Sequence, residues 1–235
     1  LIKDRGQWPA TTDYMLRGEG IFLSNAATFI ENIKVLGNTC IGNAKNGLFI
    51  IGAKEVLASN NILSYNRMSA FQISFLAGLG SNNASRISFT CNVGNYNGAD
   101  GFDCNNASGN PLINTSVNVI VDSNTFRSNG WLYPSRAEQI TRTGTKNDTV
   151  DGGACTLINV GKVTFSNNDV YDNARTCATL TNVDSCNIHN NRYYKESSGT
   201  GDDTDGIRIN GATNCSIHHN QLRIPNVAYR IEGAC

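Results

Sequence analysis

Apolar residues recur along the chain in short alternating runs that surround regularly placed asparagines. Each of these anchor asparagines has an apolar or small residue five and three positions before it and two positions after it. Around Asn38, for example, these residues are Ile33, Val35 and Cys40. An alternation of period two predicts strands that turn apolar side chains inward and polar side chains outward. The anchors are Asn38, Asn61, Asn92, Asn124, Asn168, Asn191 and Asn220.

The spacing of the anchors indicates one repeating unit of 23 residues. Successive anchors lie 23, 31, 32, 44, 23 and 29 residues apart, so insertions of 8, 9, 21 and 6 residues explain the longer intervals. In the first five copies another Asn follows the anchor five residues later. A third run, such as Gly101-Phe102-Asp103-Cys104, starts nine residues past most anchors with a small residue followed by a short alternating strand.

This repeat is typical of a right-handed parallel β-helix. One 23-residue unit cannot bury its apolar side, whereas stacked units share a continuous core. Identical asparagines at one corner of successive coils can form hydrogen-bonded ladders. We therefore predict an all-β solenoid of about seven to nine coils. A β-sandwich with Asn-rich turns would not keep a constant 23-residue remainder. Residues 1–235 are expected to form one domain, with residues 1–19 as a lead-in or partial coil.

Composition and charge narrow the class of protein further. The 33 Asn and 23 Gly residues disfavour helices. The net charge of zero argues against nucleic acid as a partner, because phosphate binding needs a basic surplus. The longest apolar stretch is only Leu48–Ile51, so we expect no membrane insertion. The chain starts with the polar sequence LIKDRGQWP, so we expect no signal peptide in it.

The four insertions predict the position of a binding groove. They fall near residues 74–82, 105–113, 130–152 and 195–203. The first two follow the third strand of their coil and the last two precede it, so all four flank one sheet. Loops at both edges of a sheet form walls, and the sheet becomes the floor of a groove. The outward positions of that floor are Phe49, Gln72, Asp103, Thr156, Thr179 and Arg208.

The repeat over residues 20–231 resembles that of the parallel β-helix superfamily, which includes pectate lyases, polygalacturonases, alginate epimerases and phage tailspike depolymerases. The segment Asn97-Gly-Ala-Asp100-Gly-Phe-Asp103 is similar to the Asn-Thr-Asp-Gly-x-Asp element of polygalacturonases. The chain departs from that group at Gly152-Gly153-Ala154, where a paired Asp is expected, and it has no Gly-His-Gly element.

The resemblance implies a protein that binds or degrades an acidic or bacterial-surface polysaccharide in the groove. Its style is closest to the tailspike depolymerases. That likeness implies a homotrimer and a location on a phage virion or outside the cell. A polysaccharide is the partner that we expect.

Three carboxylates are our catalytic candidates. Asp103 is the one carboxylate in the floor column, and Asp100 begins the same strand. Glu138, in the 21-residue insertion, could extend over the floor as a second carboxylate. A carboxylate pair can act as acid and base, or as acid and nucleophile, in a glycoside hydrolase. The alternatives are an Asx turn for Asp100 and a solvated loop charge for Glu138.

Aromatic and cationic side chains suit a sugar-binding wall. Aromatic faces stack on sugar rings, and arginine can bind carboxylates in a bidentate manner. In a polyuronate lyase or C5-epimerase, Arg142 or Lys146 would instead supply the base. A non-catalytic carbohydrate-binding fibre is the third alternative. The predicted substrate-binding residues are Gln72, Trp131, Tyr133, Arg136, Arg142, Lys146, Thr156 and Arg208.

Cysteine and acidic residues give little sign of a metal site. The eight cysteines contain no C-x-x-C motif, and no metal or cofactor is expected. Ca²⁺ at the acidic segment 202–205 is the alternative to a solvated loop. We expect the cysteines to be free thiols that fill the core. Cys104 and Cys155 are predicted to share one inward strand position, and Cys186 and Cys215 another.

Overall fold

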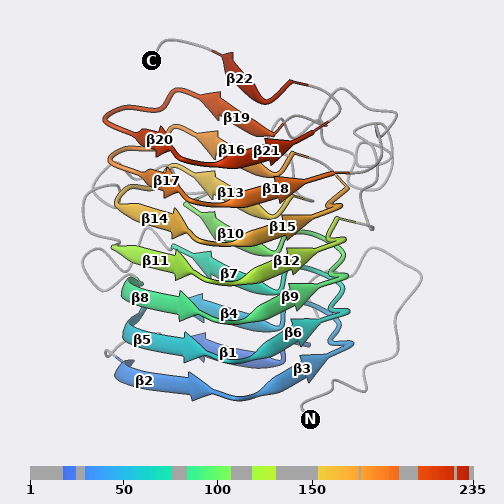
Figure 1. Cartoon of the computed structure of the whole chain (residues 1–235). Helices are drawn as coiled ribbons and strands as arrows, with labels where there is room; N and C mark the ends of the chain where they lie inside the picture. Colours follow the sequence, from blue (N-terminus) through green and yellow to red (C-terminus); the bar gives the residue numbers. More distant parts are fainter. Residues whose placement is uncertain are drawn as a thin grey trace, which may run out of the picture.

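The computed structural model describes residues 18–24, 30–75, 84–106, 118–130, 153–174, 176–195, 206–224 and 227–232. These residues form only strands, turns and bends, and every strand pairing is parallel (Figure 1). Within these ranges no helix is long and apolar enough to span a membrane. The strands form three sheets, and each sheet takes every third strand of the chain. The protein is therefore a parallel β-helix, as the repeat predicted.

Sheet 1 has eight strands, and sheets 2 and 3 have seven each. Sheet 1 consists of β1 (Ile21–Ser24), β4 (Leu48–Ile51), β7 (Phe71–Ser74), β10 (Phe102–Asn105), β13 (Cys155–Ile158), β16 (Ala178–Thr181), β19 (Ile207–Asn210) and β22 (Tyr229–Glu232). Sheet 2 consists of β2 (Ile30–Leu36), β5 (Ala53–Ser59), β8 (Ser85–Thr90), β11 (Val119–Asp122), β14 (Val163–Ser166), β17 (Asn187–His189) and β20 (Ser216–His218). Sheet 3 consists of β3 (Thr39–Ile41), β6 (Ile62–Ser64), β9 (Val93–Asn95), β12 (Thr125–Arg127), β15 (Asp169–Tyr171), β18 (Arg192–Tyr194) and β21 (Gln221–Arg223).

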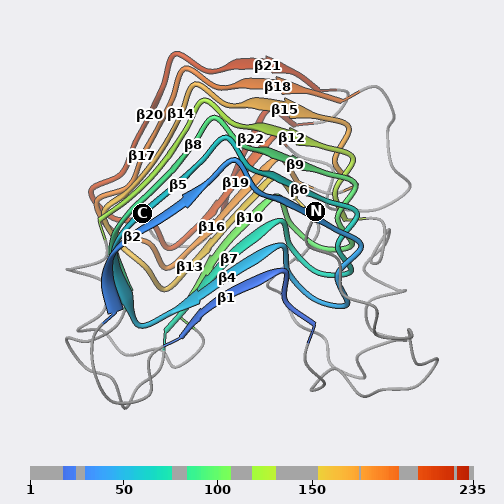
Figure 2. The same ribbon diagram turned by 90° about the horizontal axis from the view of Figure 1, so that it is seen from below.

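The core lies between sheet 1 and the bent layer that sheets 2 and 3 form together (Figure 2). Phenylalanine rings from all three sheets stack in its centre. Phe71 of sheet 1 lies 4.0 Å from Phe89 of sheet 2, measured between ring centroids, and Phe89 lies 6.5 Å from Phe126 of sheet 3. All three side chains are fully buried. This shared stack joins coils that could not bury their apolar faces alone.

Two asparagine ladders run along the corners, as predicted. In the first, both the backbone N–H and the side-chain Nδ2 of each anchor donate to Oδ1 of the anchor in the next coil. Asn92, for example, donates to Asn124 Oδ1 over 2.8 and 3.0 Å. A second ladder of the same kind joins the asparagines five residues further on, as in Asn97 to Asn129. These amides satisfy backbone donors that the corner would otherwise bury without a partner.

The residue before each anchor has a positive φ, which turns the chain sharply between sheets 2 and 3. A left-handed conformation is easiest for Gly and Asn. This explains part of the unusual composition of the chain, although larger residues also occupy the row. Its members are Gly37, Asn60, Cys91, Ser123, Asn167, Asn190 and His219.

The seven cysteines of the described residues are free thiols, but one predicted alignment was wrong. Cys104 pairs in register with Leu157, and Cys155 pairs with Phe102, so these two cysteines lie two residues apart in register. Both still face the core and are fully buried. Among the described residues, the free cysteines are Cys40, Cys91, Cys104, Cys155, Cys177, Cys186 and Cys215.

Candidate functional site

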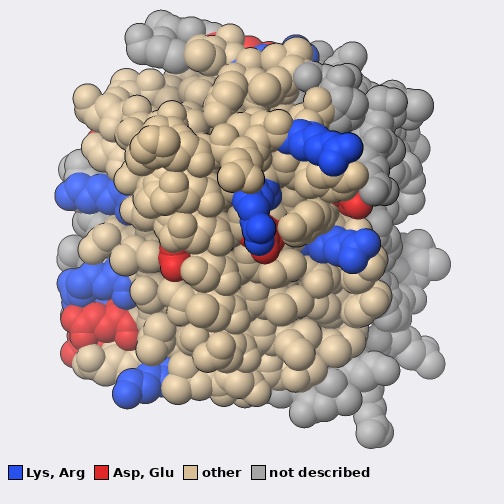
Figure 3. Space-filling model, viewed as in Figure 1, with Lys and Arg blue, Asp and Glu red and all other residues tan. Residues whose placement is uncertain are grey.

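The outward residues of sheet 1 lie in one column, in the predicted register. Asp103 pairs with Gln72 on one side and with Thr156 on the other. Phe22 and Arg230 extend the column at its two ends. Figure 3 shows the opposite face, over sheets 2 and 3, where only a few scattered side chains of the described residues are charged. The complete column is Phe22, Phe49, Gln72, Asp103, Thr156, Thr179, Arg208 and Arg230.

The centre of this column is enclosed, whereas an open groove floor was expected. Asp103 is 4% exposed and Thr156 is 0% exposed, although both point away from the core of the β-helix. At the end of the column Phe22 is 52% exposed, and its ring stacks on Phe49 at a centroid distance of 5.3 Å. The column thus combines an aromatic end that faces solvent with a polar centre that is shielded from it.

A second row of residues lies beside the column, three residues before the column residue of each coil, and its first four members are polar: Glu19, Asn46, Ser69 and Asp100. Glu19 Oε2 accepts a hydrogen bond from the Asn46 backbone N–H over 2.7 Å, and Asn46 Oδ1 accepts one from the Ser69 N–H over 2.9 Å. In the same way Asp100 Oδ1 accepts from the Gly153 N–H over 2.9 Å. Our sequence analysis missed Asn46 and Ser69 as members of this site. Aligning the repeat three positions before the column would have found them.

Side chains link the two rows into one network around Asp103. Asn46 Nδ2 donates to Gln72 Oε1 over 2.8 Å, and Gln72 Nε2 donates to Asp103 Oδ2 over 2.8 Å. The Thr156 hydroxyl donates to Asp100 Oδ1 over 2.9 Å. Thr156 is also the register partner of Asp103 on the neighbouring strand, so Asp103 and the hydrogen-bond partner of Asp100 lie side by side in the sheet. These contacts hold both carboxylates in defined orientations.

Gly153 lies beside Asp100 at a tightly packed point of the coil. A Cβ atom at this position would lie 2.3 Å from the backbone oxygen of Thr176, so a side chain would require the backbone to move. Gly153 also places its N–H against Asp100.

Charged groups near the ends of the column are mutually paired. Arg208 Nη2 donates to Glu232 Oε2 of β22 over 2.7 Å, and Arg208 Nε donates to the same oxygen over 3.0 Å. This ion pair ties β19 to β22. Arg208 therefore has a structural contact in addition to its predicted role in substrate binding.

Most of the predicted wall lies outside the described residues. The wall residues in question are Trp131, Tyr133, Arg136, Glu138, Arg142 and Lys146, together with the acidic segment 202–205. Their roles remain predictions. The described chain shows where the insertions join the fold, namely after β7 and β10 and before β13 and β19. All four therefore adjoin sheet 1. In the part of the chain that is described, no group of three or more His, Cys, Asp or Glu side chains is arranged to hold a metal ion.

Comparisons with known proteins give similar solved structures but no similar sequence. No known protein family matches the chain, and no curated protein matches it in sequence. One similar solved structure is the catalytic domain of Agl-KA, at 12% sequence identity and a TM-score of 0.42. The match covers 92% of this chain and 45% of that chain, so the protein spans less than half the length of that structure.

Proposed function

We propose that the protein binds and degrades a polysaccharide along the outer face of sheet 1, with Asp103 as a catalytic carboxylate. The observation that carries this proposal is the hydrogen-bond network midway along the sheet, in which Gln72 orients Asp103 and the register partner of Asp103, Thr156, is bonded to Asp100. Such oriented carboxylates are the groups that glycoside hydrolysis requires. The sugar rings would stack on the exposed aromatic end at Phe22 and Phe49.

Each residue has a separate role in this proposal. Asp103 acts as acid, base or nucleophile, and Asp100 is a positioning residue that holds Thr156. Gln72 fixes the orientation of Asp103 through its 2.8 Å hydrogen bond. Glu138 supplies the second carboxylate from the 21-residue insertion, and the aromatic and basic residues of that insertion bind the sugar chain. An acidic or bacterial-surface polysaccharide, outside the producing cell, is the substrate class that this set of groups fits.

The near-complete burial of Asp103 favours a second candidate function. A carboxylate that is 4% exposed and hydrogen-bonded to Gln72 is suited to holding neighbouring coils together without taking part in catalysis. In that case the protein is a non-catalytic carbohydrate-binding rod. The two candidates differ in turnover and agree in binding, so one set of assays separates them.

The first test is a screen against bacterial capsules, lipopolysaccharides and uronate polymers. New reducing ends report cleavage, and ultraviolet absorbance of unsaturated sugars distinguishes a lyase from a hydrolase. With an active substrate in hand, Asp103→Asn should lower turnover by at least about a hundredfold, because it removes charge and basicity at constant size. Oligosaccharide binding should persist, and Glu138→Gln tests the partner carboxylate in the same way.

Asp122→Asn is the matched control. Asp122 lies on β11 of sheet 2, and its Oδ1 accepts a 2.6 Å hydrogen bond from the Ser166 hydroxyl. This control substitution should leave turnover unchanged. Full turnover in Asp103→Asn together with a lower unfolding free energy would show that Asp103 is structural and would remove it from the catalytic site. Binding of a polymer without turnover of any polymer in the screen would instead replace the enzymatic function with the binding rod.

A further inference from the structure

Two cysteines on successive coils lie against each other at the start of sheet 2 strands. Cys186 directly precedes β17 and Cys215 directly precedes β20, and the register of these strands places Cys215 beside Cys186. The Cys186 backbone N–H donates to Cys215 Sγ over 3.3 Å. Cys186 is buried, whereas Cys215 is partly exposed. The pair thus has one accessible sulfur and one shielded sulfur.

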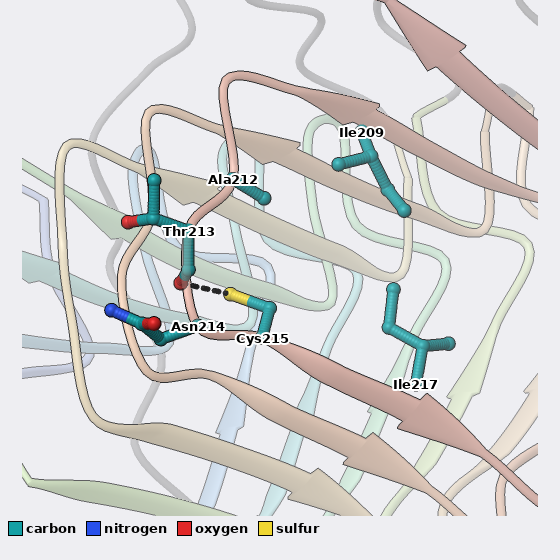
Figure 4. A pocket seen from close by; sticks show the side chains of 6 residues that line it. All are labelled: Ile209, Ala212, Thr213, Asn214, Cys215 and Ile217. Carbon is teal, nitrogen blue, oxygen red and sulfur yellow. Dashed lines mark hydrogen bonds between the residues drawn. The ribbon is translucent and has the colours of Figure 1, made fainter. Parts of the chain in front are cut away.

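A hollow of about 420 Å³ opens beside Cys215 (Figure 4). Its wall combines apolar side chains with the polar turn before β20, and the Cys215 thiol donates to the Thr213 carbonyl oxygen over 3.2 Å. β20 is the last strand of sheet 2 among the described residues. A small molecule therefore has space to reach the Cys215 sulfur. The hollow is lined by Ile209, Ala212, Thr213, Asn214, Cys215 and Ile217.

The surroundings shift the pKa values of the two thiols in opposite directions. A hydrogen bond with the Cys186 side chain lowers the pKa of Cys215 to about 7, and the Cys186 N–H adds to this, against the effect of burial. The same side-chain hydrogen bond, together with burial, raises the pKa of Cys186. Of the two thiols, Cys215 is therefore the one that loses its proton more readily near neutral pH. The thiolate is the nucleophilic form of cysteine.

We propose that Cys215 and Cys186 form a thiol–disulfide exchange site for low-molecular-weight disulfides that enter the hollow. The Cys215 thiolate attacks one sulfur of the small disulfide, forms a mixed disulfide and releases one small thiolate. The Cys186 sulfur, after losing its proton to that thiolate, attacks Cys215 Sγ and releases the second small thiolate, which takes from solvent the proton that Cys215 had lost to it. The two protein thiols are oxidised to one disulfide, and one small disulfide is reduced to two thiols.

The other described thiols are poor competitors for this reaction. Burial raises the pKa of Cys40 to about 11 and that of Cys177 to about 12. Cys91 is exposed, but it lies at a corner between sheets 2 and 3 rather than beside the hollow. Cys91 is therefore a useful internal reference for simple accessibility.

The experiment treats the native protein with oxidised glutathione at pH 7, blocks remaining thiols by alkylation and maps tryptic peptides without reduction. Peptides 176–192 and 209–223 should appear as one disulfide-linked pair. The first of these peptides also contains Cys177, so fragment ions must assign the bond to Cys186. A linkage through Cys177, Cys91 or Cys235, or no modification of Cys215, would overturn the proposal. This measurement needs no variant and so does not depend on the folding of one.

Variants distinguish the attacking role of Cys215 from the role of Cys186 in resolving the mixed disulfide. Cys186→Ala should stop the reaction at the mixed disulfide on Cys215, and Cys215→Ser should leave Cys186 unmodified. Cys91→Ser is the control and should give the wild-type linkage. The pH profile of Cys215 alkylation should have its midpoint near 7 in the wild type. In Cys186→Ala the midpoint should move toward about 8.5, the value of an ordinary thiol. An unchanged midpoint would remove Cys186 from the site.

Discussion

At the scale of single residues, the core of this β-helix accepts cysteine as a neutral side chain. Burial, followed by the charge of Asp103, raises the pKa of Cys104. Burial, followed by the charge of Asp100, does the same for Cys155. Both thiols are completely buried. The carboxylates of the candidate site thus help to keep the thiols beneath them protonated.

Replacing Cys104 with Ser should therefore lower the unfolding free energy by roughly 1–3 kcal/mol, because the substitution buries a hydroxyl in place of a weakly polar thiol. Urea unfolding measures this difference. The exposed Cys91→Ser is the control and should change stability by less than about 0.5 kcal/mol. Thiol reagents should label Cys104 slowly in the native protein and completely after unfolding. A non-reducing mass consistent with four disulfides would contradict the assignment of free thiols.

The raised pKa values also predict a loss of stability at alkaline pH. The unfolded chain releases thiol protons at about pH 8.5, whereas folded Cys40 and Cys177 hold theirs to about 11 and about 12. The resulting stability is complete below about pH 8.5 and is lost as pH rises toward the folded values. Urea unfolding between pH 8 and 10.5 should show this decline. Cys177→Ala should make the decline shallower, and an identical slope in that variant would count against this explanation.

At the scale of elements, the strands are only three to seven residues long and depend on their neighbours. The asparagine ladders supply the register between them. Asn124 accepts two hydrogen bonds from Asn92 and donates to Asn168 Oδ1 over 3.0 Å and to the Phe89 carbonyl oxygen over 2.9 Å. A residue in the middle of the ladder thus serves the coils on both sides.

Asn124→Ala should lower the unfolding free energy by at least about 2 kcal/mol, because it leaves buried donors of Asn92 without an acceptor. Asn38→Ala is the matched control at the end of the ladder, where the side chain is partly exposed and donates to Asn61 over 3.1 Å. We expect a loss below about 1 kcal/mol there. Equal losses at both positions, measured by chemical unfolding, would mean that the ladder does not act as a chain of coupled bonds.

At the scale of the whole molecule, three parallel sheets and the absence of helix from the described residues predict a simple optical signature. Far-ultraviolet circular dichroism should show β structure with almost no helix. A helical content near the globular average of about a third of residues would contradict the fold.

The fold and the column of outward residues could be predicted from sequence because equivalent positions of successive repeats pair with each other in neighbouring strands. A constant 23-residue unit places Gln72, Asp103 and Thr156 beside one another once the insertions are removed, and the strand pairing agrees. The misplacement of Cys104 relative to Cys155 came from treating all inward positions of a strand as equivalent. Each of these strands has two inward positions that lie two residues apart. The strand pairing places Cys104 beside Leu157 and Cys155 beside Phe102.

By itself the sequence determined that short strands must stack, because only stacking can bury their alternating apolar faces. The enclosure of Asp103 was decided by tertiary structure, since its partner Gln72 and that partner's own partner Asn46 come from earlier coils. The same holds for Cys215, whose sulfur receives the N–H of a residue 29 positions away. Periodicity shows which residues are neighbours. Hydrogen bonds, burial and pKa depend on distances of a few ångströms between atoms of different coils. These distances cannot be deduced from the spacing of residues along the chain.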